Sequence, residues 1–104
     1  MTLEENRLKL HAELIEILGS RNVYFQPPEN TKIKYPAIVY SREDLDDTHA
    51  NNEVYTRKIR YQIKLIDSNP INDTIEKLSH MKYCSFDRHF NSDNLNHDIF
   101  TIFY

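Results

Sequence analysis

Hydrophobic residues recur at helical spacing near the start of the chain. The pattern predicts an amphipathic helix from about residue 3 to residue 18. Thr2 with Glu5 three residues later has the form of a capping box, and Gly19 suits the position just after a helix. The apolar positions that define the helix are Leu3, Leu10, Leu14, Ile17 and Leu18.

Strand-like alternation dominates the middle of the chain, from about residue 54 to residue 66. One side of this predicted strand is mainly apolar and the other is basic and polar, which indicates one buried and one exposed face. The first side carries Arg57, Ile59, Tyr61, Ile63 and Leu65, and the second carries Thr56, Lys58, Arg60, Gln62 and Lys64.

Residues 24 to 40, YFQPPENTKIKYPAIVY, combine aromatic residues with prolines at 27, 28 and 36. Proline fixes φ and lacks a backbone donor, so we expect an extended surface arm that is neither helix nor central strand before Ala37. Residues 37 to 41 then predict an interior strand. Residues 42 to 52, REDLDDTHANN, show no periodicity and predict a long loop or a hairpin tip.

A second helix is expected after Asn69, which precedes Pro70 as a helix cap precedes proline at the first helical position. Its apolar stripe would contain Ile71, Ile75, Leu78 and Met81. Cys84, Phe86 and Phe90 alternate in a further strand, residues 92 to 94 form a turn, and IFTIFY ends the chain as a strand. The predicted class is α+β, with two helices packed on one face of a mainly antiparallel sheet of about four strands. The predicted order is helix, strand, strand, helix, strand, strand.

Composition narrows the possible functions. The 104 residues suit a single domain over residues 1–104, and the net charge of −3 gives no general attraction to nucleic acid or to an anionic membrane. The one glycine excludes the glycine-rich phosphate loops, and the one cysteine excludes an internal disulfide. The amino terminus is charged and does not resemble a secretory signal, which favours a cytoplasmic location. We expect no enzyme activity and no cofactor.

Candidate chemistry is limited to Cys84 and the histidines. Cys84 with His80 or His89 has the composition of a nucleophile and a base, but the alternation of its strand places it among buried residues. His89 and His97 flank a turn and could face each other across a hairpin. No HxxxH or HxH spacing occurs, so no metal site is predicted.

Two charged segments are the candidate subunit-interface residues. The acidic segment contains Glu43, Asp44, Asp46 and Asp47, and the basic strand face contains Lys58, Arg60 and Lys64. If these lie on different edges of the domain, they favour head-to-tail contacts between copies, which can close into a ring. A competing use of the basic face is phosphate contact with nucleic acid.

Several strings resemble a family of small tail proteins of long-tailed bacteriophages: YFQPP, KYPAIVY, RKIRYQIKLIDSNP and CSFDRHFNSDNLNHDIFTIFY. The family comprises tail terminator, tail completion or minor capsid proteins in phages and prophages of Gram-positive bacteria. The resemblance spans about residue 5 to the end.

The resemblance implies an α+β fold and a structural role in the virion. The protein would form a ring of six that caps the tail tube, ends tail growth and offers a surface for head joining. Its partners would be other copies, the major tail tube protein and a neck protein, with no membrane and no specific nucleic acid. It would reside in the virion tail, and in the host cytoplasm during assembly, where it could be monomeric. The alternatives are another neck protein, for head closure or as an adaptor, or a small regulatory module that binds through its basic sheet face.

Overall fold

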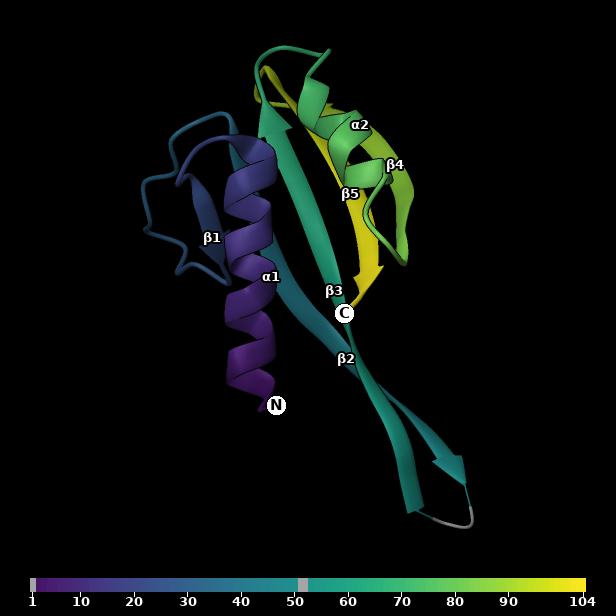
Figure 1. Ribbon diagram of the computed structural model, residues 1–104. Coiled ribbons are helices and arrows are strands. Elements are labelled where there is room, and N and C mark those ends of the chain that lie inside the picture. Colours follow the sequence, from purple (N-terminus) through teal and green to yellow (C-terminus); the bar gives the residue numbers. More distant parts are fainter. Residues whose placement is uncertain (1, 51–52) are drawn as a thin grey trace.

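A computed structural model describes residues 2–50 and 53–104, with side chains described outside residues 44–58. The class is α+β, as predicted, and the described residues form two helices and a five-stranded mixed sheet in the order β1-β2-β3-β5-β4. Both helices lie on the same face of the sheet (Figure 1). The elements are α1 (Leu3–Leu18), β1 (Val23–Phe25), β2 (Ala37–Ala50), β3 (Glu53–Asp67), α2 (Asp73–Ser79), β4 (Cys84–Ser92) and β5 (Leu95–Phe103).

Helix α1 has the predicted bounds and the predicted caps. The Thr2 side chain accepts a hydrogen bond from the Glu5 backbone N–H at 3.1 Å, which satisfies one of the donors that a helix start leaves free. Gly19 ends the helix with φ of 75°, a left-handed conformation that glycine adopts without a Cβ clash. Leu10 and Leu14 are fully buried against the sheet.

Strand β1 corrects the prediction of about four mainly antiparallel strands. It has three residues and pairs in parallel with β2, with Val23 opposite Ile38. The predicted order of elements is therefore wrong, because a third strand precedes α2. The strand was not predicted because three residues before a proline-rich segment show no periodicity, and its pairing partner lies more than a dozen residues further along the chain.

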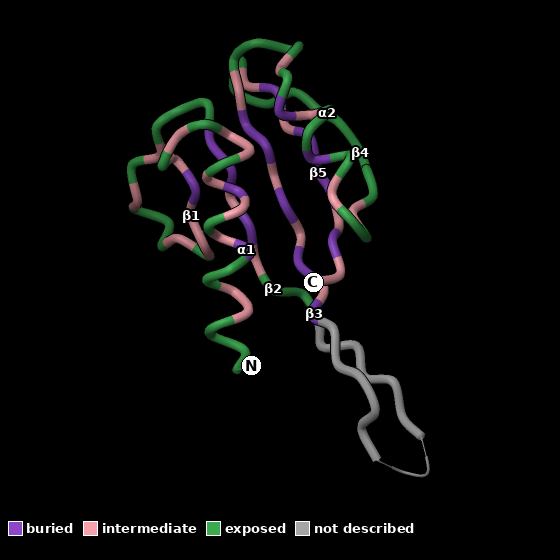
Figure 2. Tube along the Cα trace, viewed as in Figure 1, coloured by how far each residue is buried: buried purple, intermediate pink, exposed green. Residues whose placement is uncertain are grey.

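Strand β3 confirms the predicted alternation from Ile59 to Leu65, whereas the side chains of Thr56, Arg57 and Lys58 lie outside the described ones. Ile59, Tyr61, Ile63 and Leu65 are at most 2% exposed, whereas Arg60, Gln62 and Lys64 between them are partly exposed. The buried face joins a core that both helices cover, and Figure 2 shows this buried stripe along the strand. The rest of the core cluster is Leu10, Leu14, Val23, Ile38, Tyr40, Leu78, Phe100 and Ile102.

Strand β2 is an interior strand, as predicted, but it is longer than predicted. It continues through Ala50, so the expected loop or hairpin tip is strand over residues 42 to 50, and residues 51 and 52 lie outside the described part of the chain. Polar residues without periodicity form a strand here because β3 supplies backbone partners, from Ala37 opposite Ile66 to Ala50 opposite Glu53.

Helix α2 begins later than predicted. Its cap is Asn72, whose side chain accepts from the Thr74 backbone N–H at 2.8 Å. Asn69 instead accepts from the Ile71 backbone N–H in the preceding turn. As a result Ile71 is 79% exposed and lies outside the apolar stripe to which it was assigned, whereas Leu78 is fully buried.

Strands β4 and β5 form the predicted hairpin, with Asp93 and Asn94 at positive φ in the turn. One detail differs from the expected alternation of Cys84, Phe86 and Phe90. A bulge inserts one extra residue, Asp87, between the pairs that Phe86 and Arg88 make with β5. The bulge shifts the alternation, so Phe86 lies with Phe100 on the helix-covered face and Phe90 lies with His97 on the other face.

Candidate interaction surfaces

A hairpin arm projects from the sheet. Strand β5 pairs with β3 only over Arg60–Asp67, and β1 pairs with β2 only from Ile38 to Tyr40. Beyond these limits β2 and β3 pair with each other alone among the described strands. We define the hairpin arm as residues 46–50 and 53–58. It extends well past the helices in Figure 1, and the described chain measures 51 × 25 × 22 Å along its principal axes.

Except for Lys64, the predicted acidic and basic interface residues lie near one another in the strand register, at the base of the hairpin arm and within it. Asp44 lies opposite Arg60 and Asp46 opposite Lys58 in the strand register. Glu43 forms an ion pair with Arg60 across the strands, with 3.2 Å between the Arg60 Nε and Glu43 Oε2 atoms. Asp47 lies opposite Arg57, and Lys64 lies apart from this group, opposite Val39 in the body of the sheet.

This arrangement bears on the expected head-to-tail contacts. The two charged segments are neighbours in one hairpin and not on different edges of the domain, so the condition for the head-to-tail argument is not met. Opposite charges across an antiparallel pair stabilise it by about 0.2–1 kcal/mol each and disfavour a slipped register. The described Glu43–Arg60 ion pair therefore acts inside the subunit, and contact of the charged residues with another copy stays a prediction.

A polar cluster of side chains links α1 to β2. The hydroxyl of Tyr40, only 1% exposed, lies 2.6 Å from the His11 Nδ1 atom and 3.3 Å from the Arg7 guanidinium, which donates to it. The buried hydroxyl proton needs an acceptor, and unprotonated Nδ1 supplies one. Burial, and then the charge of Arg7, lower the pKa of His11, which favours this neutral ring. Arg7 also lies over the Phe25 ring, 4.6 Å from its centroid.

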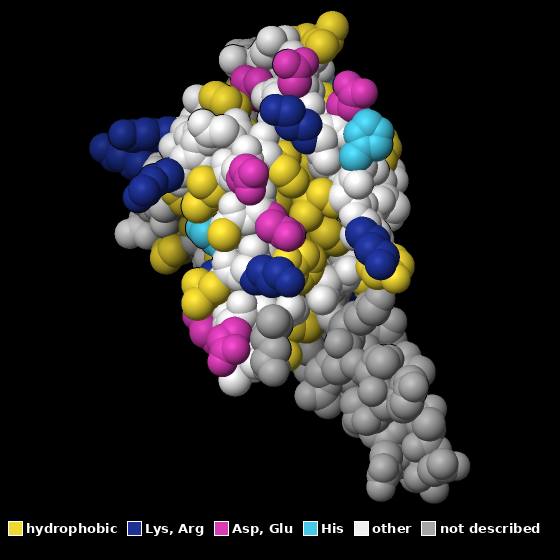
Figure 3. All heavy atoms as spheres, in the orientation of Figure 1, with side chains coloured by type: hydrophobic (Ala, Val, Ile, Leu, Met, Phe, Trp, Pro, Cys, Tyr) yellow, Lys and Arg dark blue, Asp and Glu magenta, His cyan; other side chains and the backbone are white. Residues whose placement is uncertain are grey.

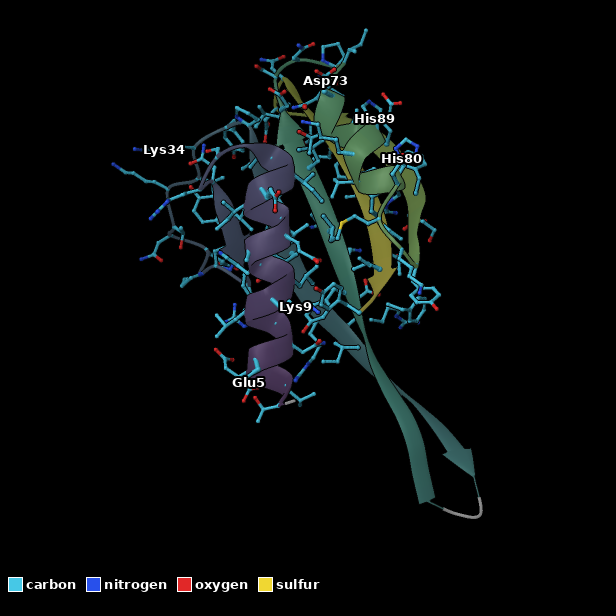
Figure 4. The ribbon with its side chains drawn as sticks, in the orientation of Figure 1. Glu5, Lys9, Lys34, Asp73, His80 and His89 are labelled. Atoms are coloured by element: carbon cyan, nitrogen blue, oxygen red, sulfur yellow. The ribbon has the colours of Figure 1, made fainter. Side chains whose placement is uncertain are left out.

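A groove of about 570 Å³ runs between α1 and the end of β5. Figure 3 shows hydrophobic side chains at the surface beside α1, and Figure 4 marks Lys9 on that helix. The Tyr104 hydroxyl donates to Glu13 Oε2 at 2.8 Å across one end, and burial followed by this bond raises the Tyr104 pKa. The two walls are formed by Lys9, Glu13 and Ile17 on one side and by Tyr83, Phe103 and Tyr104 on the other.

The structure describes the surroundings of Cys84, His89 and His97, the residues considered from sequence. Burial raises the pKa of the Cys84 thiol to about 11, so its nucleophilic thiolate is scarce at neutral pH. His89 does not face His97 across the hairpin, because it lies opposite Asp98 and its Nδ1 is 2.8 Å from the Asp98 Oδ1. His97 instead stacks on Phe90, with 4.6 Å between ring centroids. The described residues contain no cluster of three metal-ligating side chains.

These elements define an α+β protein whose mixed sheet carries both helices on one face and extends into a hairpin arm. Neither helix in the described part of the chain has the length and apolar character that crossing a bilayer requires. No protein-family model matches the sequence, and no curated protein matches it either.

Proposed function

We propose that this protein is a structural subunit of a long-tailed phage, a tail terminator that caps the tail tube as a ring. In this role it ends tail growth and provides the surface for head joining, without catalysis. The observation that carries the proposal is the hairpin arm, in which β2 and β3 leave the sheet and pair only with each other among the described strands. The sequence strings that resemble phage tail proteins support the same proposal.

The hairpin arm needs a surface on another molecule. A two-stranded ribbon without a third strand or a helix is marginally stable in water, whereas the same ribbon packed on a neighbouring subunit gains buried area. A projection on one side of the subunit that docks elsewhere on the next copy gives a head-to-tail contact, and such contacts close into a ring when the rotation permits. The groove beside α1 is a concave surface of the kind that this contact requires.

The charge of the chain suits the proposed position. DNA passes through the tail lumen and must not be retained there, and a net charge of −3 gives the ring no general attraction to it. The function then depends on shape and on subunit contacts.

Disruption of the gene in a phage or prophage that carries it tests the proposal. Loss of a terminator should produce overlong tails without heads in negative-stain images, whereas loss of another neck protein should leave tails of normal length. Complementation by the intact gene should restore normal particles. A variant in which Asn-Gly replaces residues 46–58 should fail to restore them, because it lacks the hairpin arm. Normal particles without the gene would contradict the proposal.

One observation favours a second candidate, a small regulatory module. Lys64 and Arg88 flank Ile99 in the strand register on the sheet face opposite the helices, where Arg88 is exposed and Lys64 partly exposed. An acidic protein or a nucleic acid would bind it with an affinity that falls as salt rises. Electrophoretic mobility shifts with a nucleic acid that disappear in Lys64→Glu would support this module. Neighbouring genes for a major tail protein and a tape measure would instead support the terminator.

A further inference from the structure

The two edges of the sheet differ in how far they are protected. The β1 edge has three residues and continues into a segment with prolines at 27, 28 and 36, features that prevent strand addition. The β4 edge has nine residues, eight of them exposed, and β5 is its only neighbour among the described strands. Figure 2 shows this exposed strand along the side of the molecule. Such an edge presents a row of backbone donors and acceptors to a further strand.

Large hydrophobic side chains are exposed along the same edge. Phe86 is 52% exposed and Phe90 is 38% exposed, and Tyr83, just before the strand, is 55% exposed. Phe86 projects on the helix-covered face, and Phe90 projects on the opposite face, which we call the open face, because the bulge at Asp87 separates them. A long edge strand with exposed apolar side chains favours pairing with a further strand.

The bulge also gives β4 a symmetric pattern of faces. On one side of Asp87 and Arg88, the strand has Phe86 on the helix-covered face and Ser85 on the open face. On the other side it has His89 on the helix-covered face and Phe90 on the open face. A regular strand could not show this mirror pattern about a point between two residues, since its side chains alternate strictly.

From this pattern we infer that two copies of this chain pair through their β4 strands, antiparallel and related by a two-fold axis between Asp87 and Arg88. Opposite residues in an antiparallel pair must share a face. In this register Phe86 of one copy lies opposite His89 of the other and Ser85 lies opposite Phe90, and both pairs meet that condition.

Charge selects the same register. Asp87 of each copy lies opposite Arg88 of the other, which gives two attractive pairs. If the two-fold axis lay half a residue further along the strand in either direction, Arg88 would lie opposite Arg88 of the other copy, or Asp87 opposite Asp87. In the first case Phe86 would lie opposite Phe90, and in the second it would lie opposite Arg88. Both of these residues are on the open face, so neither register is possible. The edge is therefore complementary to a second copy of itself, as a two-fold interface requires.

This pairing is independent of the proposed tail function. A ring around a single axis uses head-to-tail contacts. We therefore expect the two-fold β4 pair in the free protein, before the ring assembles on a tail.

Sedimentation equilibrium of the purified full chain over a range of concentrations tests the inference. The intact protein should show a monomer–dimer equilibrium. Arg88→Asp replaces two attractive pairs by repulsive ones and should weaken the dimer by about tenfold or more. The charge exchange Asp87→Arg with Arg88→Asp should restore it, because each pair is again attractive. Arg21→Asp is the control, because it makes the same charge change at an exposed residue outside β4 and should leave the dimer unchanged.

Hydrogen exchange supplies a second measurement that does not depend on a variant. Backbone amides of residues 85 to 90 should gain protection as the protein concentration rises, and those of α1 should not. A protein that stays monomeric up to its solubility limit would overturn the inference. So would a dimer or a six-membered ring that is insensitive to Arg88→Asp, although that ring would support the tail function. A charge exchange that fails to restore the dimer while the variant's far-ultraviolet circular dichroism matches the intact protein would also overturn it.

Discussion

The body of the sheet and the hairpin arm use the same two strands in different ways. In the body, Ile38, Tyr40, Ile63 and Leu65 are at most 1% exposed beneath the helices. In the hairpin arm, β2 and β3 continue past their other described neighbours and pair with each other alone. Burial fixes the register in the body, whereas opposite charges at the base of the arm favour the same register there. One pair of strands therefore belongs both to the core and to a projecting arm.

The largest expected effect lies in the body. Phe100 is fully buried and contacts Phe86 edge to face, with 5.4 Å between ring centroids. Phe100→Ala should lower the free energy of unfolding by about 3–5 kcal/mol, because it removes buried apolar surface and leaves a cavity. Urea denaturation followed by circular dichroism measures this. Ile71→Ala, at a residue that is 79% exposed, is the control and should change the value by less than about 0.5 kcal/mol. Equal effects of the two substitutions would contradict the assignment of the core.

A smaller effect concerns the attachment of α1 to the body. Because the folded protein lowers the pKa of His11, the unfolded chain binds the proton more readily. The stability associated with neutral His11 is thus complete above the unfolded pKa of about 6.5 and is lost as pH falls through the lower folded pKa.

The intact protein should therefore lose stability below about pH 6.5, and His11→Gln, which keeps an uncharged acceptor, should show a shallower decrease. Denaturation at several pH values measures both proteins. Burial also lowers the pKa of His97, but that residue is present in both proteins, so the difference between their curves reports His11. If the stability of the two proteins changed with pH in the same way, His11 would not be the source of the pH dependence.

The smallest expected effect on the folding of the body comes from removing the hairpin arm. Leu45 lies opposite Ile59, so replacing residues 46–58 with Asn-Gly joins two opposite positions by a two-residue turn. The free energy of unfolding should change by less than about 1 kcal/mol, because the core residues remain and only a marginally stable ribbon is lost. Urea denaturation of the truncated protein measures it. A loss comparable to that of Phe100→Ala would show that the arm belongs to the same cooperative unit as the body.

Local signals predicted the elements whose stability is local. The helix over residues 3 to 18 has its own caps and period, and the turn at residues 92 to 94 has its own sequence signature. From Ile59 to Leu65 the third strand alternates because one of its faces is buried. Strand β1 was missed because three residues carry no period and a distant partner supplies the pairing. The start of α2 was misplaced because two asparagines compete as caps, and only the turn shows that Asn69 binds the Ile71 N–H.

The sequence identified the charged residues of the candidate interface, but it did not predict that they lie opposite each other in one hairpin. A usable signal was present in the sequence, since Asp44, Asp46 and Asp47 mirror Arg57, Lys58 and Arg60 about a point near residue 52. That symmetry is what an antiparallel hairpin requires if opposite charges are to lie across from each other. The acidic segment alone shows no period, so without its basic partner it predicted a long loop or a hairpin tip.

The sequence by itself determined where apolar residues can be buried, which residues cap α1, and that the chain has one glycine, one cysteine and a small net negative charge. The tertiary structure alone decided which strands are neighbours, how far β2 runs, and that the bulge at Asp87 places Phe86 and Phe90 on opposite faces. The reason is physical. Capping and amphipathic burial depend on residues a few positions apart, whereas strand pairing depends on backbone partners that a linear pattern does not identify.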